Sequence, residues 1–318
     1  MADVVLVGEA MGMFVANENG SLLEGKSFSK GVAGAEVNVG IGLTRLGFNV
    51  SFLTKLGTDP FGEYIHDYLQ RENIGTEYIT FDKDHTTGLM LKSKIDKGDP
   101  QTSYYRKDSA FSTFSIEDVI NKIDFNNVRV LHVTGIPAAL NEITRGAVYY
   151  LMAQAKEAGT FITFDPNLRP SLWKDEKTMI LVMNDLAKYA NVVLPGITEG
   201  EILTGSKDKE EITDFYLKLG VDYVVIKTGE EGAFIKKNDK SVIHVPGFKV
   251  DRVVDTVGAG DGFAVGIISG YLAGLDMKEA AERANAIGAI QVQQQSDNEG
   301  LPTYNELDRY IKENKGNC

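Results

Sequence analysis

Short apolar runs alternate with longer amphipathic segments along most of the chain. The apolar runs are rich in β-branched residues and predict strands over residues 3–8, 49–55, 128–134, 160–165, 190–195, 223–228, 232–237 and 241–245. Helical periodicity predicts helices over residues 35–47, 60–73, 141–158, 175–189, 208–219, 258–274, 276–294 and 303–315. This alternation is typical of a mostly parallel sheet with helices on both faces. Because such sheets bind ligands beyond the carboxyl ends of their strands, residues that directly follow a strand are the first candidates for a site.

Two segments interrupt this alternation. Residues 10–33 are rich in Gly, Ser and polar residues, and residues 86–112 form two extended pieces around the sequence DKGDP at 96–100. Because Gly, Asp and Pro favour tight turns, the second segment predicts a β-hairpin. The two segments together predict a small sheet, here called the lid (10–33 and 86–112), that stands off an α/β domain formed by residues 1–9, 34–85 and 113–318.

Composition and charge exclude several functions. The 318-residue chain is 43% hydrophobic and 25% charged, as expected of a globular protein with a sizeable core. Its net charge of −12 argues against nucleic acid as a partner, because binding to a phosphate backbone needs a basic surface. For the same reason, any anionic ligand must meet cations that the protein places locally. No run approaches the ~18 apolar residues of a membrane-spanning helix, so the sequence predicts no membrane partner.

Cysteine usage indicates the compartment. The single cysteine is Cys318, so an intrachain disulfide is excluded. The N-terminal segment lacks the basic region of a secretory signal. Both observations favour a reducing, cytoplasmic location.

The strongest chemical motif is the sequence DTVGAGDGF at residues 255–263, which follows a β-rich stretch and opens a helix of small residues. A glycine-rich turn at the start of a helix presents several free N–H groups to an anion, and the helix dipole adds positive potential there. Asp261 would lie in the first turn, where its carboxylate can accept the proton of an attacking hydroxyl. The alternative is that Asp261 only caps the helix and the glycines only permit close packing. The spacing fits neither a dinucleotide-binding fingerprint nor a Walker P-loop.

This segment resembles the C-terminal signature of the ribokinase-like (PfkB) carbohydrate kinases. The sequence GVAGAEVNV at 31–39, with Leu46-Gly47, resembles the family's N-terminal glycine motif, and LGTDPFG at 56–62 resembles the loop that follows it. The resemblance implies a three-layer α/β/α sandwich with a mostly parallel sheet and a β-sheet lid, which the two interrupting segments would supply. It also implies that Asp261 is the catalytic base and that the amides of Gly258, Ala259 and Gly260 form the anion hole.

The nucleotide side of the resemblance lies later in the chain. The sequence KTGEEG at 227–232 follows a strand and resembles the family's loop for the adenosine phosphates, which implies that Lys227, Gly229 and Gly232 bind the cofactor together with Gly258 and Gly260. Asn285 resembles a residue near the adenine. A hairpin turn and a surface asparagine are the alternative interpretations.

The resemblance implies ATP and Mg²⁺ as cofactors and leaves a monovalent cation open. The family's N-x-x-E sequence helps to hold Mg²⁺ through water, whereas this chain has GITE at 196–199 and keeps only Glu199. A carboxylate near phosphates suits a hard cation such as Mg²⁺. The alternative is that Glu199 is simply an acidic residue at a helix start.

Within the family, two local features resemble kinases of 2-keto-3-deoxygluconate. They are the sequence GAEVN at 34–38, which implies substrate contacts by Gly34 and Asn38, and the pair YYR at 104–106 and FDPNLRPSLW at 164–173. A keto acid carries a carboxylate, and the planar fork of an arginine suits it. Arg106 on the lid and Arg169 after a strand are the candidates, and Tyr104 adds a hydroxyl and apolar cover. Arg169 could instead contact nucleotide phosphate, and Arg106 could be a solvated hairpin charge.

Three further positions complete the sequence-based picture. The sequence SDNEG at 296–300 resembles the family's closing loop, in which Asp297 would hydrogen-bond sugar hydroxyls, although a polar turn is the alternative. Met90 stands where the keto-deoxygluconate kinases commonly have Tyr, so one expected hydroxyl is missing from the substrate site. None of the four histidines shows metal-ligand spacing; His132 and His244 fall within apolar strand runs, which predicts that both are buried.

The sequence therefore predicts ATP-dependent phosphorylation of the terminal hydroxyl of 2-keto-3-deoxygluconate. One alternative is a kinase of a neutral sugar such as fructose or ribose. Another is a regulatory protein that binds nucleotide or sugar without turnover. The resemblance also implies a homo-oligomer formed through the lid, for which apolar lid residues such as Leu89 and Leu91 would be available.

Overall fold

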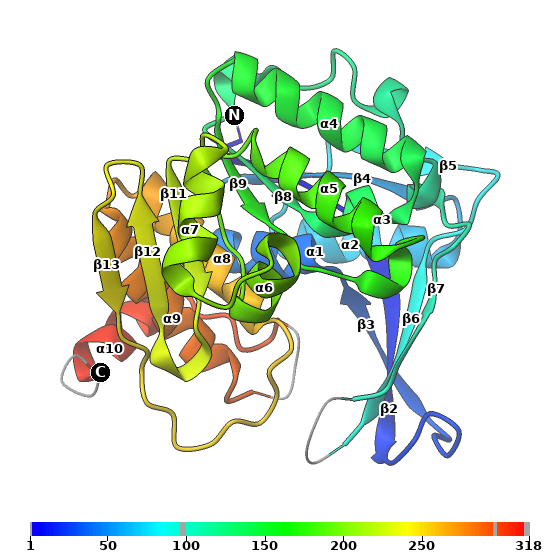
Figure 1. Ribbon diagram of the computed structural model, residues 1–318. Coiled ribbons are helices and arrows are strands. Elements are labelled where there is room, and N and C mark those ends of the chain that lie inside the picture. Colours follow the sequence, from blue (N-terminus) through cyan, green and yellow to red (C-terminus); the bar gives the residue numbers. More distant parts are fainter. Residues whose placement is uncertain (1, 96–99, 295–297, 315–318) are drawn as a thin grey trace.

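The computed structural model describes residues 2–95, 100–294 and 298–314. In this part of the chain a nine-stranded sheet lies between two layers of helices, and a four-stranded sheet projects from that body (Figure 1). The strands of the large sheet, in spatial order, are β13 (Val242–Val245), β12 (Ala233–Lys237), β11 (Tyr223–Lys227), β10 (Val192–Val193), β9 (Phe161–Asp165), β8 (Val130–Thr134), β1 (Val4–Val7), β4 (Val50–Gly57) and β5 (Ile79–Asp82). Neighbours from β11 to β5 are parallel, whereas β12 and β13 run antiparallel.

The two layers of helices bury the two faces of each central strand. Val4 and Leu6 of β1 belong to one core, and Val5 and Val7 to the other, as the two-residue repeat of a strand requires. The first core is closed by α1, α2, α8, α9 and α10, and the second by α3 to α7. The helices are α1 (Ala35–Arg45), α2 (Pro60–Arg71), α3 (Gly135–Leu140), α4 (Glu142–Glu157), α5 (Glu176–Ala187), α6 (Ile197–Thr204), α7 (Lys209–Lys218), α8 (Ala259–Leu272), α9 (Met277–Gln291) and α10 (Tyr304–Asn314).

Short 3₁₀ helices occupy several connections, at η1 (Ala110–Thr113), η2 (Ile116–Asp118), η3 (Phe125–Asn127), η4 (Pro170–Leu172) and η5 (Gly229–Glu231). Among the described helices, none combines the length and the apolar character that a membrane span demands.

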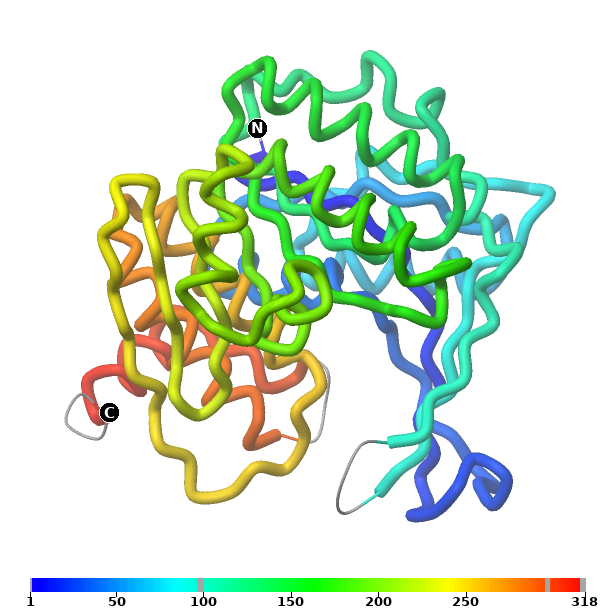
Figure 2. The backbone as a smooth tube through the Cα atoms, viewed as in Figure 1, coloured from blue at the N-terminus to red at the C-terminus, as the bar shows by residue number. Residues whose placement is uncertain are grey.

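The lid is formed by the two segments that interrupt the alternation. Its strands, in spatial order, are β3 (Phe28–Ala33), β2 (Met11–Asn19), β6 (Leu89–Lys94) and β7 (Thr102–Tyr105). Two antiparallel hairpins join through a parallel pairing of β2 with β6. The tube in Figure 2 shows both hairpins extending away from the body. The predicted turn at 96–99 lies outside the described residues.

The predicted architecture and most predicted elements are confirmed, but three elements were missed. The strand β5 is half-exposed at the sheet edge and lacks a long apolar run. The helix α3 has six residues and contains Pro137, so its periodicity is short. The helix α6 contains Thr and Gly, which are weak helix formers, and begins because the Glu199 side chain accepts the Gly196 N–H at 2.8 Å. Conversely, the strand predicted over 190–195 is regular only at Val192–Val193.

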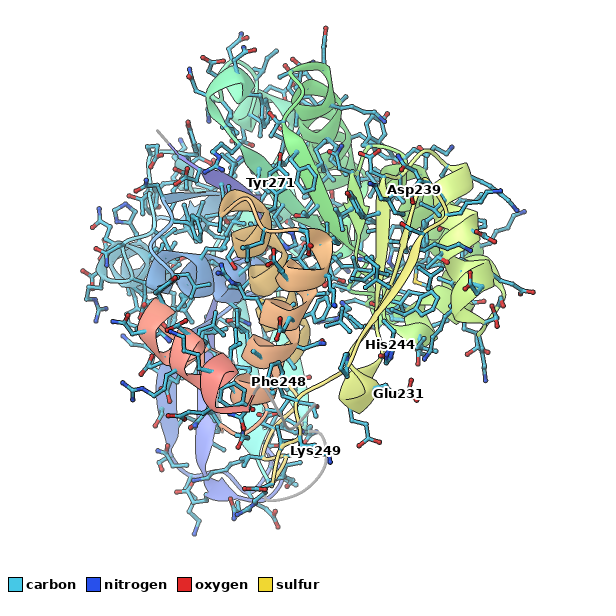
Figure 3. The ribbon with its side chains drawn as sticks, turned by 90° about the vertical axis from the view of Figure 1, so that its left-hand side faces the viewer. Glu231, Asp239, His244, Phe248, Lys249 and Tyr271 are labelled. Atoms are coloured by element: carbon cyan, nitrogen blue, oxygen red, sulfur yellow. The ribbon has the colours of Figure 1, made fainter. Side chains whose placement is uncertain are left out.

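The predicted burial of His244 is wrong. His132, on the interior strand β8, is fully buried and its Nδ1 lies 2.8 Å from Thr163 Oγ1, whereas His244 is exposed on β13. Figure 3 shows His244 beside Glu231 at one end of this sheet edge. An edge strand has no neighbour on one side, so an apolar run there does not require burial.

Candidate active site

The start of α8 has the geometry of an anion site. Gly258 adopts φ 78° and ψ −8° just before the helix, a left-handed conformation that favours glycine. The helix then begins at Ala259, and the Gly258 carbonyl accepts the Gly262 N–H at 2.8 Å. A β-carbon on Gly260 would lie 3.7 Å from Lys227 Nζ, so the amide turn and this cation lie close together. The N–H groups and the ammonium together favour a bound phosphate.

Close packing of α8 against α9 positions this turn. A β-carbon on Gly266 would lie 2.2 Å from Ala284 Cα, and one on Gly270 would lie 2.5 Å from Ala280 Cβ. The small residues that follow the motif therefore allow the two helices to approach each other. Gly266 and Gly270 therefore serve packing, whereas Gly258 shapes the turn before the helix.

Asp261 lies in the first turn of α8, half-buried, and its Oδ2 accepts a hydrogen bond from Asn38 Nδ2 at 2.8 Å. Burial raises the pKa of this carboxyl to about 8, opposed by the Asn38 hydrogen bond and reinforced by the negative charges of Asp165 and Glu36. A carboxylate with a raised pKa is a stronger base, so this environment suits proton removal from a hydroxyl.

Lys227, at the end of β11, forms an ion pair with Asp165, at the end of β9. Lys227 Nζ lies 2.9 and 2.8 Å from the two Asp165 oxygens and 4.0 Å from Glu199 Oε2. Although burial opposes its charge, the Asp165 and Glu199 carboxylates raise the pKa of the Lys227 ammonium. Asp165 also accepts the Asn167 N–H at 3.1 Å and so stabilises the loop that follows β9.

Glu199 caps two backbone segments. Its carboxylate accepts the N–H of Gly196 and the N–H of Leu168, both at 2.8 Å. Its contacts are therefore those of an acidic residue at the start of a helix. The same side chain also faces the cavity described below. Within the described residues, no three His, Cys, Asp or Glu side chains are grouped as a protein-only metal site would require.

Arg169 is held by its own loop. One terminal nitrogen donates to Asn167 Oδ1 at 2.6 Å and to the carbonyls of Asn167 and Leu168 at 3.2 and 3.0 Å. Asn167 has φ 39°, a left-handed conformation that asparagine tolerates. These hydrogen bonds within the loop hold one side of the Arg169 guanidinium in place, and the residue lines the cavity described below.

Arg106 is a buried charge and is not a solvated hairpin residue. Its guanidinium is 9% exposed and forms an ion pair of 2.5 Å with Glu9, which lies in the connection between β1 and β2. Ser109 Oγ donates to the other Glu9 oxygen at 2.5 Å. Burial nevertheless raises the pKa of Glu9, with the Arg106 charge as the main opposing influence. Tyr104 covers this region, with its ring 5.9 Å from the Arg106 guanidinium carbon.

Glu36 is a second buried carboxyl near the site, and the sequence motif that contains it did not identify it as a site residue. It lies in the first turn of α1, is 1% exposed, and accepts a hydrogen bond from Thr134 Oγ1 at 2.5 Å. Burial raises its pKa to about 7. Its position was detectable as a charged residue between small and apolar ones at the start of a helix.

Lys92 connects the lid to the signature motif. It lies on β6, and its Nζ lies 3.2 Å from Asp255 Oδ2 while the other Asp255 oxygen accepts the Val257 N–H at 3.0 Å. The cation is thus placed between the lid and the turn that begins α8, at the entrance to the site.

These groups surround one cavity of about 340 Å³ between the body and the lid. Eleven of the predicted site residues line it, and they are Gly34, Asn38, Met90, Tyr104, Arg106, Arg169, Glu199, Lys227, Gly258, Gly260 and Asp261. Four cations, Lys92, Arg106, Arg169 and Lys227, face it together with the carboxyl groups of Asp165, Glu199 and Asp261. An acidic protein thus gathers four cations, three of them held by carboxylates, where an anionic substrate and a nucleotide would meet.

Four of the remaining predicted site residues, Gly229, Gly232, Ala259 and Asn285, do not line this cavity. Gly229 and Gly232 form the β11–β12 turn at φ 63° and 96°, and Asn285 is buried on α9. Asn285 Nδ2 donates to the carbonyls of Val245 and Pro246, both at 3.0 Å, so it is not a free surface asparagine. Ala259 begins α8, and Asp297 lies outside the described residues.

The sequence matches the pfkB family of carbohydrate kinases over residues 1–304. It is 50% identical to a 2-dehydro-3-deoxygluconokinase of Bacillus subtilis, over 97% of this chain and 95% of that protein. A 2-dehydro-3-deoxygluconokinase of Thermoproteus tenax is 33% identical, over 98% of this chain and 95% of the relative.

Solved structures agree with this match. A PfkB protein from Polaromonas sp. JS666 superposes with a TM-score of 0.88 at 41% identity, covering 97% of this chain and 99% of that one. A sugar kinase from Pyrococcus horikoshii in complex with ATP gives 0.80 at 28% identity, with 99% and 100% covered. A fructokinase double mutant from Vibrio cholerae with bound fructose, ADP and potassium gives 0.85 at 26% identity, with 98% of both chains covered.

Proposed function

Because the chain belongs to the pfkB family of carbohydrate kinases, we propose that it transfers the γ-phosphoryl group of ATP to the terminal hydroxyl of 2-keto-3-deoxygluconate. This sugar acid is also called 2-dehydro-3-deoxygluconate, the substrate in the names of the two relatives above. The products are 2-keto-3-deoxy-6-phosphogluconate and ADP.

One observation carries the chemical part of the proposal: Asp261 faces a cavity lined by four cations, from the first turn of a helix whose glycine-rich start presents free amides. In the reaction, Asp261 accepts the proton of the terminal hydroxyl as its oxygen attacks the γ-phosphorus. The amides of Gly258, Ala259 and Gly260 bind the phosphoryl oxygens, on which negative charge is concentrated in the transition state. The P–O bond to ADP breaks as the new bond forms.

The sugar end of the cavity supports an acidic substrate. The carboxylate of the keto acid would approach Arg106 and Arg169, with Gly34, Asn38, Met90, Tyr104 and Asp297 as further substrate contacts. Arg106 is already held by Glu9, so its guanidinium is oriented before the substrate binds, which reduces the entropy lost on binding. The lid (10–33 and 86–112) would cover the substrate and exclude water from the remaining domain (1–9, 34–85 and 113–318).

The nucleotide would lie across Lys227, Gly229 and Gly232 and the α8 turn, with its adenine near Asn285. The residues fit a cation that is held mainly by the phosphates: Glu199 faces the cavity and is the carboxylate available to bind Mg²⁺ through water. When bound, Mg²⁺ neutralises phosphate charge. A monovalent cation, as named for the Vibrio cholerae structure, is a further candidate cofactor.

We also propose a cytoplasmic location, in keeping with the use of ATP, and a homo-oligomer formed through the lid. Tyr105 and Leu23 are 61% and 94% exposed on the lid, whereas Leu89 and Leu91 are half-buried and offer less surface than expected. Analytical ultracentrifugation of the wild type and of Tyr105→Glu tests the oligomer. A monomeric wild type would contradict it.

The test of the function is an ADP-release assay with 2-keto-3-deoxygluconate, gluconate, fructose, ribose and nucleosides, with the phosphorylated product identified by ³¹P NMR. We expect the keto acid to give the highest kcat/KM. A higher kcat/KM for fructose or ribose would identify the protein as a kinase of neutral sugars instead. Nucleotide binding without ADP release from any acceptor would indicate a regulatory protein instead.

A further inference from the structure

Two buried amides connect the last described loop to Asp261. Asn298 Nδ2 donates to Asn38 Oδ1 at 3.1 Å, and Asn38 Nδ2 donates to Asp261 Oδ2 at 2.8 Å. Asn298 and Asn38 are 5% and 4% exposed. Asn298 itself was not among the residues assigned to the site, and it is not among those that line the cavity.

The backbone of Asn298 is anchored separately from its side chain. Arg45, in the last turn of α1, donates to the carbonyls of Asn298 and Leu301, each at 3.0 Å. Asn38 lies on the same helix. The loop that contains Asn298 is therefore fixed relative to Asn38, and an exchange of the Asn298 side chain leaves this anchor in place.

The orientation of the Asn38 amide is decided by its partners. The C=O and NH₂ ends of an amide have nearly the same size, so packing does not distinguish them. If the Asn38 amide were reversed, its Oδ1 would face the Asp261 carboxylate and two acceptors would meet. A donor placed on Asn38 Oδ1 prevents that reversal.

We propose that Asn298 is a positioning residue for the phosphoryl-transfer reaction: its N–H group fixes the Asn38 amide so that Asn38 presents a donor to Asp261. This inference rests on the proposed role of Asp261 as the base. The Asn38 hydrogen bond stabilises the ionised carboxylate, which is the form that accepts a proton. Asn298 thus acts on the reaction without touching the substrate or the reacting atoms.

Other charges also act on Asp261 and must stay constant in a test. Glu36 on α1 and Asp165 at the end of β9 disfavour its ionisation, whereas Arg169 after β9 and Lys227 at the end of β11 favour it. Asn298→Ala changes none of these charges. Asn298→Leu keeps about the same side-chain size, removes the donor and adds no charge, so it serves as the second variant.

The direct test is a pH titration of the Asp261 carboxyl by ¹³C NMR in the protein without ligands, with the signal assigned from its loss in Asp261→Asn. We expect Asn38→Ala to move the midpoint up by about one pH unit or more, as the loss of a hydrogen bond to a charged group predicts. Asn298→Ala should move it up by part of that amount. The rising limb of kcat against pH should move in the same direction while KM for ATP stays unchanged.

A double-mutant cycle separates this role from general loosening of the loop. In the Asn38→Ala background, Asn298→Ala should leave the midpoint where it is. Glu299→Gln, an exposed side chain on the same loop, should leave both the midpoint and kcat unchanged. If Asn298→Ala does not fold, as judged by its melting temperature, the uncharged Asn298→Leu is titrated in its place, with the same cycle.

The proposal is overturned if the midpoint does not move in the Asn298 variant, or if it moves equally with and without Asn38. A wild type that fails to phosphorylate the keto acid would instead remove the proposed function. The titration still decides the positioning role in that case, because it does not depend on turnover.

Discussion

Lys227 and Asp165 form a two-pronged ion pair between the ends of β11 and β9, on either side of the short β10, with Nζ 2.9 and 2.8 Å from the two carboxylate oxygens. Asp165 is 2% exposed. Lys227→Met would leave this carboxylate buried without its cation, so we expect the free energy of unfolding to fall by about 3 kcal/mol. Urea denaturation measures the change, and Lys227→Met/Asp165→Asn should recover part of it. Equal stability of the single variant and the wild type would contradict the pairing.

Asp261→Asn tests the base. Asparagine keeps the shape and the Asn38 contact but cannot accept the proton, so kcat should fall by at least about 10²-fold. Calorimetric titration should give an unchanged Kd for ATP. Asp239→Asn removes the same charge at the far end of the β12–β13 edge and is the control (Figure 3). Turnover of Asp261→Asn within tenfold of the wild type would exclude this carboxylate as the base.

Glu36 should make stability depend on pH. Its pKa is raised from 4.5 to about 7 by burial, so the folded protein keeps a proton that the unfolded chain releases. The contribution of Glu36 to stability is therefore complete below about pH 4.5 and is lost as the pH rises through about 7. Glu36→Gln does not titrate, so its unfolding free energy relative to the wild type should increase from about pH 5 to about pH 8. A flat difference would count against this account, and Glu157→Gln, which changes an exposed carboxyl on α4, is the control.

Arg106→Ala should discriminate between acidic and neutral substrates. The loss of a buried partner of a carboxylate typically costs about 2–5 kcal/mol, so kcat/KM for the keto acid should fall far more than that for any neutral sugar accepted. The variant also leaves Glu9 buried without its cation, which lowers stability for a different reason. Glu9→Gln/Arg106→Met removes that second effect. If both substrates lose equally in the double variant, Arg106 does not bind the carboxylate.

Two glycine substitutions separate packing from helix propensity. Gly266→Ala would place a β-carbon 2.2 Å from Ala284 Cα, so it should push α8 from α9 and lower the melting temperature. Gly146 lies in α4, and no other element in the described part of the chain comes within 4 Å of an added β-carbon, so Gly146→Ala should stabilise the protein by about 0.5–1 kcal/mol. The two variants carry the same chemical change. Changes of the same sign would show that contact with α9 does not decide the outcome.

The sequence was most informative where the chemically important residues also determine the local backbone conformation. The motif at 255–263 predicted both the turn of Gly258 and the position of Asp261, because a left-handed glycine and a first-turn carboxylate are local features. The two interrupting segments likewise predicted the small sheet, whose four strands all lie within residues 10–33 and 86–112. The expected cleft location of Arg106 and Arg169 agrees with the cavity lining, and their substrate contacts remain proposals.

The partners of these residues could not be predicted, because they are tertiary contacts between distant segments. Nothing near Glu9 in the sequence indicates that it meets Arg106, and the Asn298–Asn38–Asp261 series joins three separate parts of the chain. His244 was misplaced for a related reason. Its apolar neighbours indicate a strand, but whether that strand lies inside the sheet or at its edge depends on strand order.

The ion pair of Glu9 and Arg106 joins the residue just before the first lid hairpin to the residue just after the second. Both hairpins are thereby tied at a single point where they leave the body, and that point is also the proposed contact for the substrate's carboxylate. A substrate carboxylate that binds to the Arg106 guanidinium would therefore act on the bases of both lid hairpins together. If the lid moves when substrate binds, the two events would then be thermodynamically linked, so a change that favours the substrate-bound position of the lid would also raise the affinity for the substrate.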